Sequence, residues 1–92
     1  MKITAQFHGI LADWVGTPAA DFELPANAAY ADLVKEIGRR YKQNMPEQLW
    51  DQKNNTFNKK IRPFRDGKPL NAMDFSLREE DKITFFLMIA GG

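Results

Sequence analysis

The sequence predicts an α+β fold: a mixed sheet of four to five strands with one main helix packed on one face. Two patterns and their order predict it. Residues 2–8 and 82–89 alternate apolar and polar side chains, which is typical of half-buried strands. Residues 30–41 place apolar side chains at helical spacing. A chain of 92 residues has room for one hydrophobic core, so we expect a single domain over residues 1–92.

The composition excludes several classes of function. A formal net charge of +1 gives no electrostatic reason to expect a nucleic-acid or membrane partner. Cysteine is absent, which excludes disulfides, thiolate metal sites and a cysteine nucleophile, and a single His leaves too few ligands for a typical metal site. No apolar run reaches the roughly 18 residues of a membrane helix. Residues 1–6 lack a signal-peptide core, so we expect a cytoplasmic protein without metal.

The first half of the chain contains a strand pair and the main helix. The strand at residues 2–8 precedes a short helical turn at residues 10–15. Residues 20–24 form a second strand, antiparallel to the first. The N-cap of the main helix stays open, because Asn27 is the best capping side chain but Ala29 stands where the helical pattern begins. The apolar face of this helix consists of Tyr30, Leu33, Val34, Ile37 and Tyr41.

The middle of the chain is harder to interpret. Pro46 indicates the start of a short helix that carries Leu49 and Trp50. Residues 57–64 are extended, and Pro63 among them indicates an edge or irregular strand, because proline cannot donate a hydrogen bond to a sheet.

The last third of the sequence returns to regular patterns. Asp66-Gly67 indicates a tight turn, followed by a short strand at residues 68–70. Residues 78–81 (Arg-Glu-Glu-Asp) form a solvated corner. Residues 82–89 are the most apolar strand, so we place them at the centre of the sheet, parallel to the first strand. This order of elements defines the ubiquitin-like β-grasp.

The sequence ends in Gly91-Gly92 directly after this apolar strand. One interpretation is a frayed end of the chain. The other is a carboxylate that enters the active site of another protein, because a glycine tail without side chains fits a narrow channel. Adenylation by ATP would make the Gly92 carboxylate reactive towards a sulfur nucleophile.

Four segments together resemble one known family. They are residues 7–17 (FHGILADWVGT), 22–25 (FELP), 30–33 (YADL) and 81–92 (DKITFFLMIAGG). In this order they resemble the MoaD/ThiS family of sulfur-carrier proteins, which share the ubiquitin-like β-grasp fold. The long first connection, residues 9–19, makes the sequence more similar to the MoaD branch, the small subunit of molybdopterin synthase.

The resemblance implies a co-substrate subunit rather than an enzyme. An adenylating enzyme of the MoeB/ThiF type would use ATP to activate Gly92, and a sulfur donor would convert this end to a thiocarboxylate. A MoaE-like large subunit would then use the sulfur to build molybdopterin, the organic part of the Mo/W cofactor. A flexible tail at about residues 88–92 would thread into these partners through Ile89, Ala90 and Gly91. The chain itself would bind no cofactor.

The last strand also predicts a docking surface for such partners. Phe86 and Met88 lie on the strand face opposite its core residues, and His8 lies at the same end of the neighbouring strand. The alternative is that residues 42–60 cover this face and make Phe86 part of the core. Residues 53–68 are rich in Lys and Arg, which indicates either a basic edge that attracts an acidic partner or a solvated face.

Other functions remain compatible with these features. A ubiquitin-like modifier would transfer Gly92 to a lysine, a ThiS-type carrier would serve another sulfur pathway, and a plain interaction module would not use the Gly-Gly end. An exposed apolar patch could also form a homodimer when the partner is absent.

Members of the family usually have Gly at the position of Glu80, in the turn before the last strand.

Overall fold

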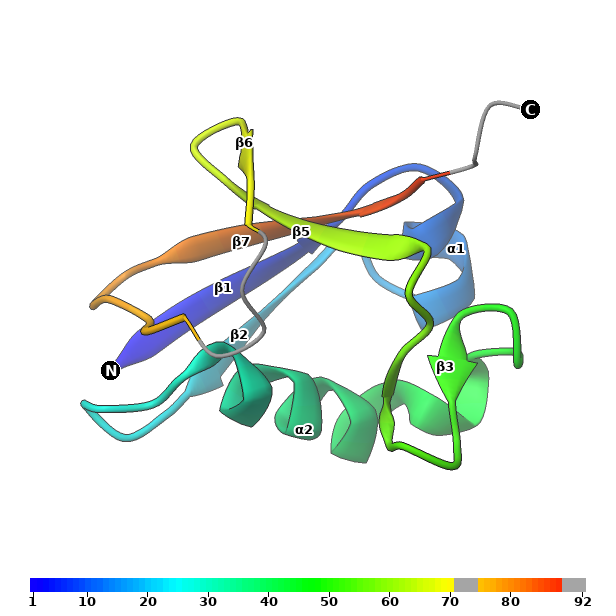
Figure 1. Cartoon of the computed structure of the whole chain (residues 1–92), viewed down its shortest axis with the longest axis horizontal. Coiled ribbons are helices and arrows are strands. Elements are labelled where there is room, and N and C mark those ends of the chain that lie inside the picture. Colours follow the sequence, from blue (N-terminus) through cyan, green and yellow to red (C-terminus); the bar gives the residue numbers. More distant parts are fainter. Residues whose placement is uncertain (71–74, 89–92) are drawn as a thin grey trace.

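In the computed structural model, which describes residues 1–70 and 75–88, five strands form one mixed sheet (Figure 1). Their spatial order is β2 (Ala19–Glu23), β1 (Lys2–Phe7), β7 (Lys82–Leu87), β5 (Ile61–Arg65) and β6 (Lys68–Pro69). Strands β1 and β7 are parallel, and the other neighbours are antiparallel. Helix α2 (Tyr30–Tyr41) covers one face of the sheet. The predicted α+β fold, with the last strand in its centre, is confirmed.

Alternation along the central strands places the core between the sheet and α2. Ile3, Ala5 and Phe7 of β1 are buried, and so are Ile83 and Phe85 of β7. Leu33 and Ile37 of α2 belong to the same cluster and are fully buried. Each of these Ile, Leu and Phe side chains stabilises the fold by about 1.5–3 kcal/mol relative to an exposed position. The short helix α1 (Ile10–Val15) adds Leu11 and Val15 to this core.

The start of helix α2 resolves the position that the sequence left open between Asn27 and Ala29. The N-cap is Ala29, and its N–H donates a hydrogen bond of 2.9 Å to Asp32 Oδ2. Alanine has no side-chain acceptor, so Asp32 supplies the capping interaction from inside the first turn. The carboxylate there also lies at the positive end of the helix dipole.

Helix α2 also comes very close to the indole of Trp50. A Cβ atom at position 38 would lie 2.6 Å from Trp50 Cη2 and closer still to Cζ2. Trp50 is 1% exposed and its ring packs edge-on against Phe57, so neighbouring side chains hold it in place. This close approach explains a glycine inside a helix, where it costs about 1 kcal/mol relative to alanine.

The short helix predicted at Pro46 is absent; a turn takes its place. The backbone N–H groups of Leu49 and Trp50 both donate to the Pro46 carbonyl, and the chain then enters a hairpin. Between α2 and β5 the chain contains η1 (Lys42–Asn44), β3 (Trp50–Asp51) and β4 (Thr56–Phe57). The hairpin packs on the helix side, because Phe57 lies 5.0 Å from the buried ring of Phe85.

Strand β5 is not an edge strand, contrary to the indication from Pro63. It lies between β7 and β6, and the Pro63 carbonyl accepts a hydrogen bond from Leu70 N–H. Since the N and C=O of a strand residue point to the same side, the missing N–H of Pro63 faces away from β7. The turn after β5 is as predicted: Asp66 and Gly67 have φ angles of 52° and 78°, which is typical of a type I′ hairpin.

The corner at residues 78–81 is less solvated than predicted. Asp81 is buried and forms a bidentate ion pair with Arg65, with distances of 3.1 Å to Nε and 2.5 Å to Nη2. The Arg78 N–H donates to the same carboxylate. Next to it, Glu80 has a φ of 61°, in the left-handed region that favours glycine.

Candidate functional site

The outer face of the sheet, opposite α2, brings the predicted docking residues together. Because β1 and β7 are parallel, His8 and the end of β7 lie at the same edge. The His8 N–H donates to the Phe85 carbonyl over 3.1 Å, which extends the pairing of the two strands by one residue. The His8 and Phe86 rings consequently lie 4.6 Å apart. Met88 lies two residues further along the chain and is 47% exposed.

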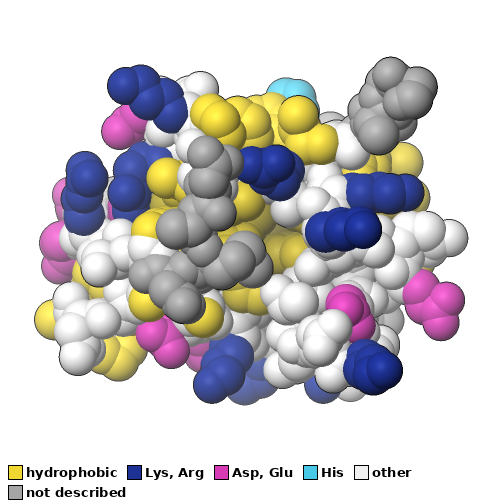
Figure 2. All heavy atoms as spheres, viewed as in Figure 1, with side chains coloured by type: hydrophobic (Ala, Val, Ile, Leu, Met, Phe, Trp, Pro, Cys, Tyr) yellow, Lys and Arg dark blue, Asp and Glu magenta, His cyan; other side chains and the backbone are white. Residues whose placement is uncertain are grey.

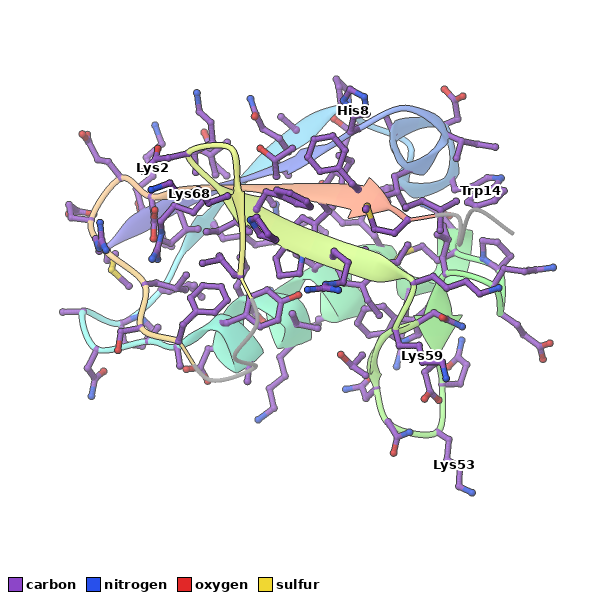
Figure 3. The ribbon with its side chains drawn as sticks, turned by 45° about the horizontal axis from the view of Figure 1, so that its top comes forward. Lys2, His8, Trp14, Lys53, Lys59 and Lys68 are labelled. Atoms are coloured by element: carbon purple, nitrogen blue, oxygen red, sulfur yellow. The ribbon has the colours of Figure 1, made fainter. Side chains whose placement is uncertain are left out.

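One aromatic residue of this face was missed from the sequence. Phe64 of β5 makes an edge-on contact with Phe86, with ring centroids 4.8 Å apart. The signal was present, since Arg62 and Phe64 alternate with the buried residues Ile61 and Pro63. We call His8, Phe64, Phe86 and Met88 the outer aromatic surface. Figure 3 shows His8 projecting from the edge of this face.

Residues 42–60 do not cover this surface. Their described strands pack on the helix side, where Trp50 and Phe57 join the core. Phe86 is therefore half-buried by its neighbours within the sheet rather than by a separate segment. The alternative in which Phe86 is part of the core is wrong.

Polar pairs continue the outer face away from the aromatic residues. Thr84 Oγ1 donates to Gln6 Oε1 over 3.1 Å, and Thr4 Oγ1 donates to Asp21 Oδ1 over 2.8 Å. Lys2 Nζ lies 3.7 Å from Asp21 Oδ2. The face thus has an aromatic end, next to Met88, and a polar end with hydrogen-bonded side chains.

The predicted reactive end follows this surface directly in the sequence. Met88 is the last described residue after β7, and its N–H donates to the Lys60 carbonyl over 2.7 Å. This hydrogen bond fixes the position at which the chain leaves the sheet. The predicted tail residues Ile89, Ala90, Gly91 and Gly92 lie outside the described residues.

The described residues at this surface provide mainly aromatic and apolar contact area. They contain no group of three or more His, Asp or Glu side chains placed to hold a metal ion. No helix in the described ranges is long and apolar enough to cross a membrane. The only imidazole, that of His8, contacts an aromatic ring.

The sheet order and the single covering helix define the class: the chain has the fold of ubiquitin-like β-grasp proteins, among them small modifiers and MoaD-like proteins. SAMP1 from Haloferax volcanii superimposes with a TM-score of 0.79 at 15% identity, covering 100% of both chains. A putative molybdopterin converting factor subunit 1 from Pyrococcus furiosus gives 0.73 at 20% identity, covering 97% of this chain and 99% of that one. Urm1 from Trypanosoma brucei gives 0.72 at 21% identity, covering 99% and 95%.

These likenesses confirm the fold and the similarity to ubiquitin-like proteins. The neighbours are small ubiquitin-like proteins rather than catalytic enzymes. No protein-family model and no curated protein sequence matches the chain. At such low identity a shared fold does not transfer a function, because β-grasp domains serve many roles.

Proposed function

We propose that the protein is a sulfur carrier of the molybdopterin-synthase type, acting through the carboxylate of Gly92. The observation that supports this proposal is the position of β7. This central strand runs along the outer aromatic surface and continues in the sequence directly into Ala90-Gly91-Gly92. A partner that holds this surface is therefore positioned to receive the residues that follow Met88.

The chemistry requires two steps, both catalysed by a partner. In the first, the Gly92 carboxylate attacks the α-phosphorus of ATP, and pyrophosphate leaves. In the second, a sulfide-equivalent nucleophile attacks the acyl carbon, and AMP leaves with the electrons of the C–O bond. The product is a C-terminal thiocarboxylate, which carries one sulfur atom in place of one oxygen. The sulfur then passes to a pterin precursor held by a MoaE-like large subunit.

The outer aromatic surface supplies the contacts for an adenylating enzyme of the MoeB/ThiF type. Aromatic side chains are frequent energetic centres of protein interfaces, and Phe86 lies in the middle of this group, between His8 and Phe64. Met88 provides exposed apolar area next to it. A carrier of this kind works together with cytoplasmic enzymes that use ATP, which is consistent with the expected location.

The first experiment measures the intact mass of the untagged protein after incubation with ATP, a sulfide donor and the adenylating enzymes of its cell extract. We expect a fraction in which sulfur replaces one oxygen, located at Gly92 by fragmentation. Deletion of Gly92 abolishes this product without changing the thermal unfolding temperature. An unchanged mass in the wild-type protein contradicts the proposal.

A second experiment tests the docking surface. We expect Phe86→Ala to slow thiocarboxylate formation at limiting enzyme, whereas Lys35→Ala, on the exposed side of α2, has no effect. Equal rates for the two variants contradict the role of the outer aromatic surface. They leave the chemistry of Gly92 as a separate question, since the first experiment tests that independently.

A ubiquitin-like modifier is the second candidate, and the similarity to SAMP1, a small archaeal modifier protein, favours it. Activation is the same, but a lysine amine attacks the acyl carbon and forms an isopeptide bond. The two functions differ in their products. A modifier gives covalent adducts of higher mass that resist reducing agents, whereas a sulfur carrier gives the thiocarboxylate alone.

A further inference from the structure

A groove opens between the β3–β4 hairpin and strand β5, and its lining includes Arg62, which lies opposite Phe86 in the register of β5 and β7. It has a volume of about 960 Å³. Its apolar residues come from four parts of the chain: Tyr30, Trp50, Phe57, Ile61, Pro63 and Leu70. Figure 2 shows Lys and Arg side chains on this side of the molecule, and its largest group of hydrophobic side chains lies beside the histidine.

The segment that the sequence patterns left unexplained forms one wall of this groove. Residues 42–60 match the resembled family poorly, yet they contribute Trp50 and Phe57 to the core and Lys53 and Lys59 to the margin of the groove. The apolar residues of the groove are buried apart from Leu70, which is half-buried, whereas Lys53 and Lys59 are exposed. The hairpin thus places two charged side chains at the margin of the groove.

The charges on the margin favour an anionic occupant. Lys53 lies in the β3–β4 turn and Lys59 in the connection from β4 to β5, and both project from the chain segments that border the groove (Figure 3). In the described part of the chain, neither ammonium group lies within ion-pair distance of a carboxylate. Both are thus available to a partner.

Asp51, which also lines the groove, is engaged by its own turn. Asp51 Oδ1 accepts hydrogen bonds from the backbone N–H groups of Lys53 and Asn54, and Asp51 Oδ2 accepts one from the Asn54 side chain. These bonds, led by the one from the Asn54 side chain, lower the pKa of Asp51, and the positive charge of Lys53 adds to the same effect. Glu47 is the other acidic residue that lines the groove.

We propose that this groove binds an acidic peptide segment of a partner protein, with apolar side chains in the groove and carboxylates at Lys53 and Lys59. The two ammonium groups would select for negative charge, and the half-buried Leu70 would provide apolar contact. The proposal does not depend on the chemistry of Gly92.

The test uses the peptide acetyl-Asp-Glu-Asp-Leu-Phe-Asp-Glu-Asp-amide as probe and NMR of the labelled full chain as readout. We expect shifts of the Trp50 indole N–H and of the Phe57 and Ile61 amides, with the resonances of His8 and Phe86 unchanged. The peptide acetyl-Lys-Arg-Lys-Leu-Phe-Lys-Arg-Lys-amide, which has the same apolar centre, should bind more weakly.

Charge reversal separates the groove from general electrostatic attraction. The double variant Lys53→Glu/Lys59→Glu should weaken binding of the acidic peptide about tenfold, because two attractive pairs become repulsive. The double variant Lys35→Glu/Lys42→Glu has the same change of net charge on exposed residues outside the groove, and should bind nearly as well as the wild type.

Three results overturn the proposal. They are absence of binding by the acidic peptide, equal weakening in both double variants, and shifts confined to the outer aromatic surface. Since all four substituted lysines are exposed, the variants should retain the native spectrum, and loss of folding does not complicate the comparison.

Discussion

Substitution of Gly38 by alanine tests the close contact between α2 and Trp50, because two physical effects predict opposite signs. Intrinsic helix propensity favours alanine over glycine by about 1 kcal/mol inside a helix. The packing predicts the reverse, since the new Cβ would lie 2.6 Å from Trp50 Cη2 and closer to Cζ2. Helix propensity alone therefore predicts a more stable protein, and the structure predicts a less stable one.

The magnitude follows from how little the indole can move. Trp50 is 1% exposed, and its ring is held edge-on against Phe57 at 5.2 Å. Overpacking of a core costs about 1–3 kcal/mol, and a contact with two rigid ring carbons belongs at the upper end. After the gain in propensity, we expect Gly38→Ala to lower the free energy of unfolding by about 2 kcal/mol. For a chain of this size that corresponds to a melting temperature lower by about 10 °C.

The assay is urea unfolding of four proteins: the wild type, Gly38→Ala, Trp50→Leu and the double variant. Trp50→Leu destabilises the fold by itself, but it removes the ring that obstructs the new methyl group. In that background Gly38→Ala should be neutral or stabilising by up to about 1 kcal/mol. The reasoning is refuted if Gly38→Ala stabilises the wild-type protein. It is also refuted if the substitution lowers the free energy of unfolding equally with and without Trp50→Leu.

Three further predictions concern charge and backbone conformation. Glu80→Gly should raise the melting temperature, because Glu80 has a φ of 61° and relief of this conformation is worth up to about 1 kcal/mol. Arg65→Leu should lower the free energy of unfolding, measured in urea, by about 3–5 kcal/mol, because Asp81 is left as a buried charge without its ion-pair partner. Adding Asp81→Asn should recover part of this loss. Burial raises the pKa of Tyr30 above its ordinary value of 10.0 in the folded protein. The phenol therefore ionises more readily in the unfolded chain, so stability should fall above about pH 10 by up to about 1.4 kcal/mol per pH unit, and Tyr30→Phe should remove that part of the slope in alkaline unfolding curves.

The parts of the fold that the sequence predicts are those in which one periodic pattern extends over several residues. Strands β1 and β7 and helix α2 each bury one face, so their apolar residues repeat with the period of the element. The Asp66-Gly67 turn was predictable for another local reason, since both residues tolerate a positive φ. In each case the information lies within a few neighbouring residues.

The parts that were missed depend on contacts between residues far apart in the sequence. Strands β3 and β4 have two residues each, too few to show any periodicity. The position of their hairpin is fixed by Trp50 against Gly38 and by Phe57 against Phe85. Among four consecutive polar residues, nothing local marks Asp81 as the one that pairs with Arg65, sixteen positions away in the chain.

The candidate site shows the same limit. His8, Phe86 and Met88 were assigned to one surface because parallel neighbouring strands end at the same edge, and the structure brings them together. Phe64 was missed because the assignment of β5 as an edge or irregular strand left its pairing partner open. Once Arg62 is opposite Phe86 in the register, Phe64 must lie on the same outer face.

The pleat of β7 gives two adjacent phenylalanines different roles. Phe85 is fully buried and contacts the rings of Phe7 and Phe57, whereas Phe86 points to the other face and contacts His8. A shift of one residue in the register would exchange them and expose the core residue. The hydrophobic core therefore fixes the register, and the register in turn places the outer aromatic surface. A surface of this kind can change its partner through substitutions at Phe64, Phe86 or Met88 while the core residues keep the fold unchanged.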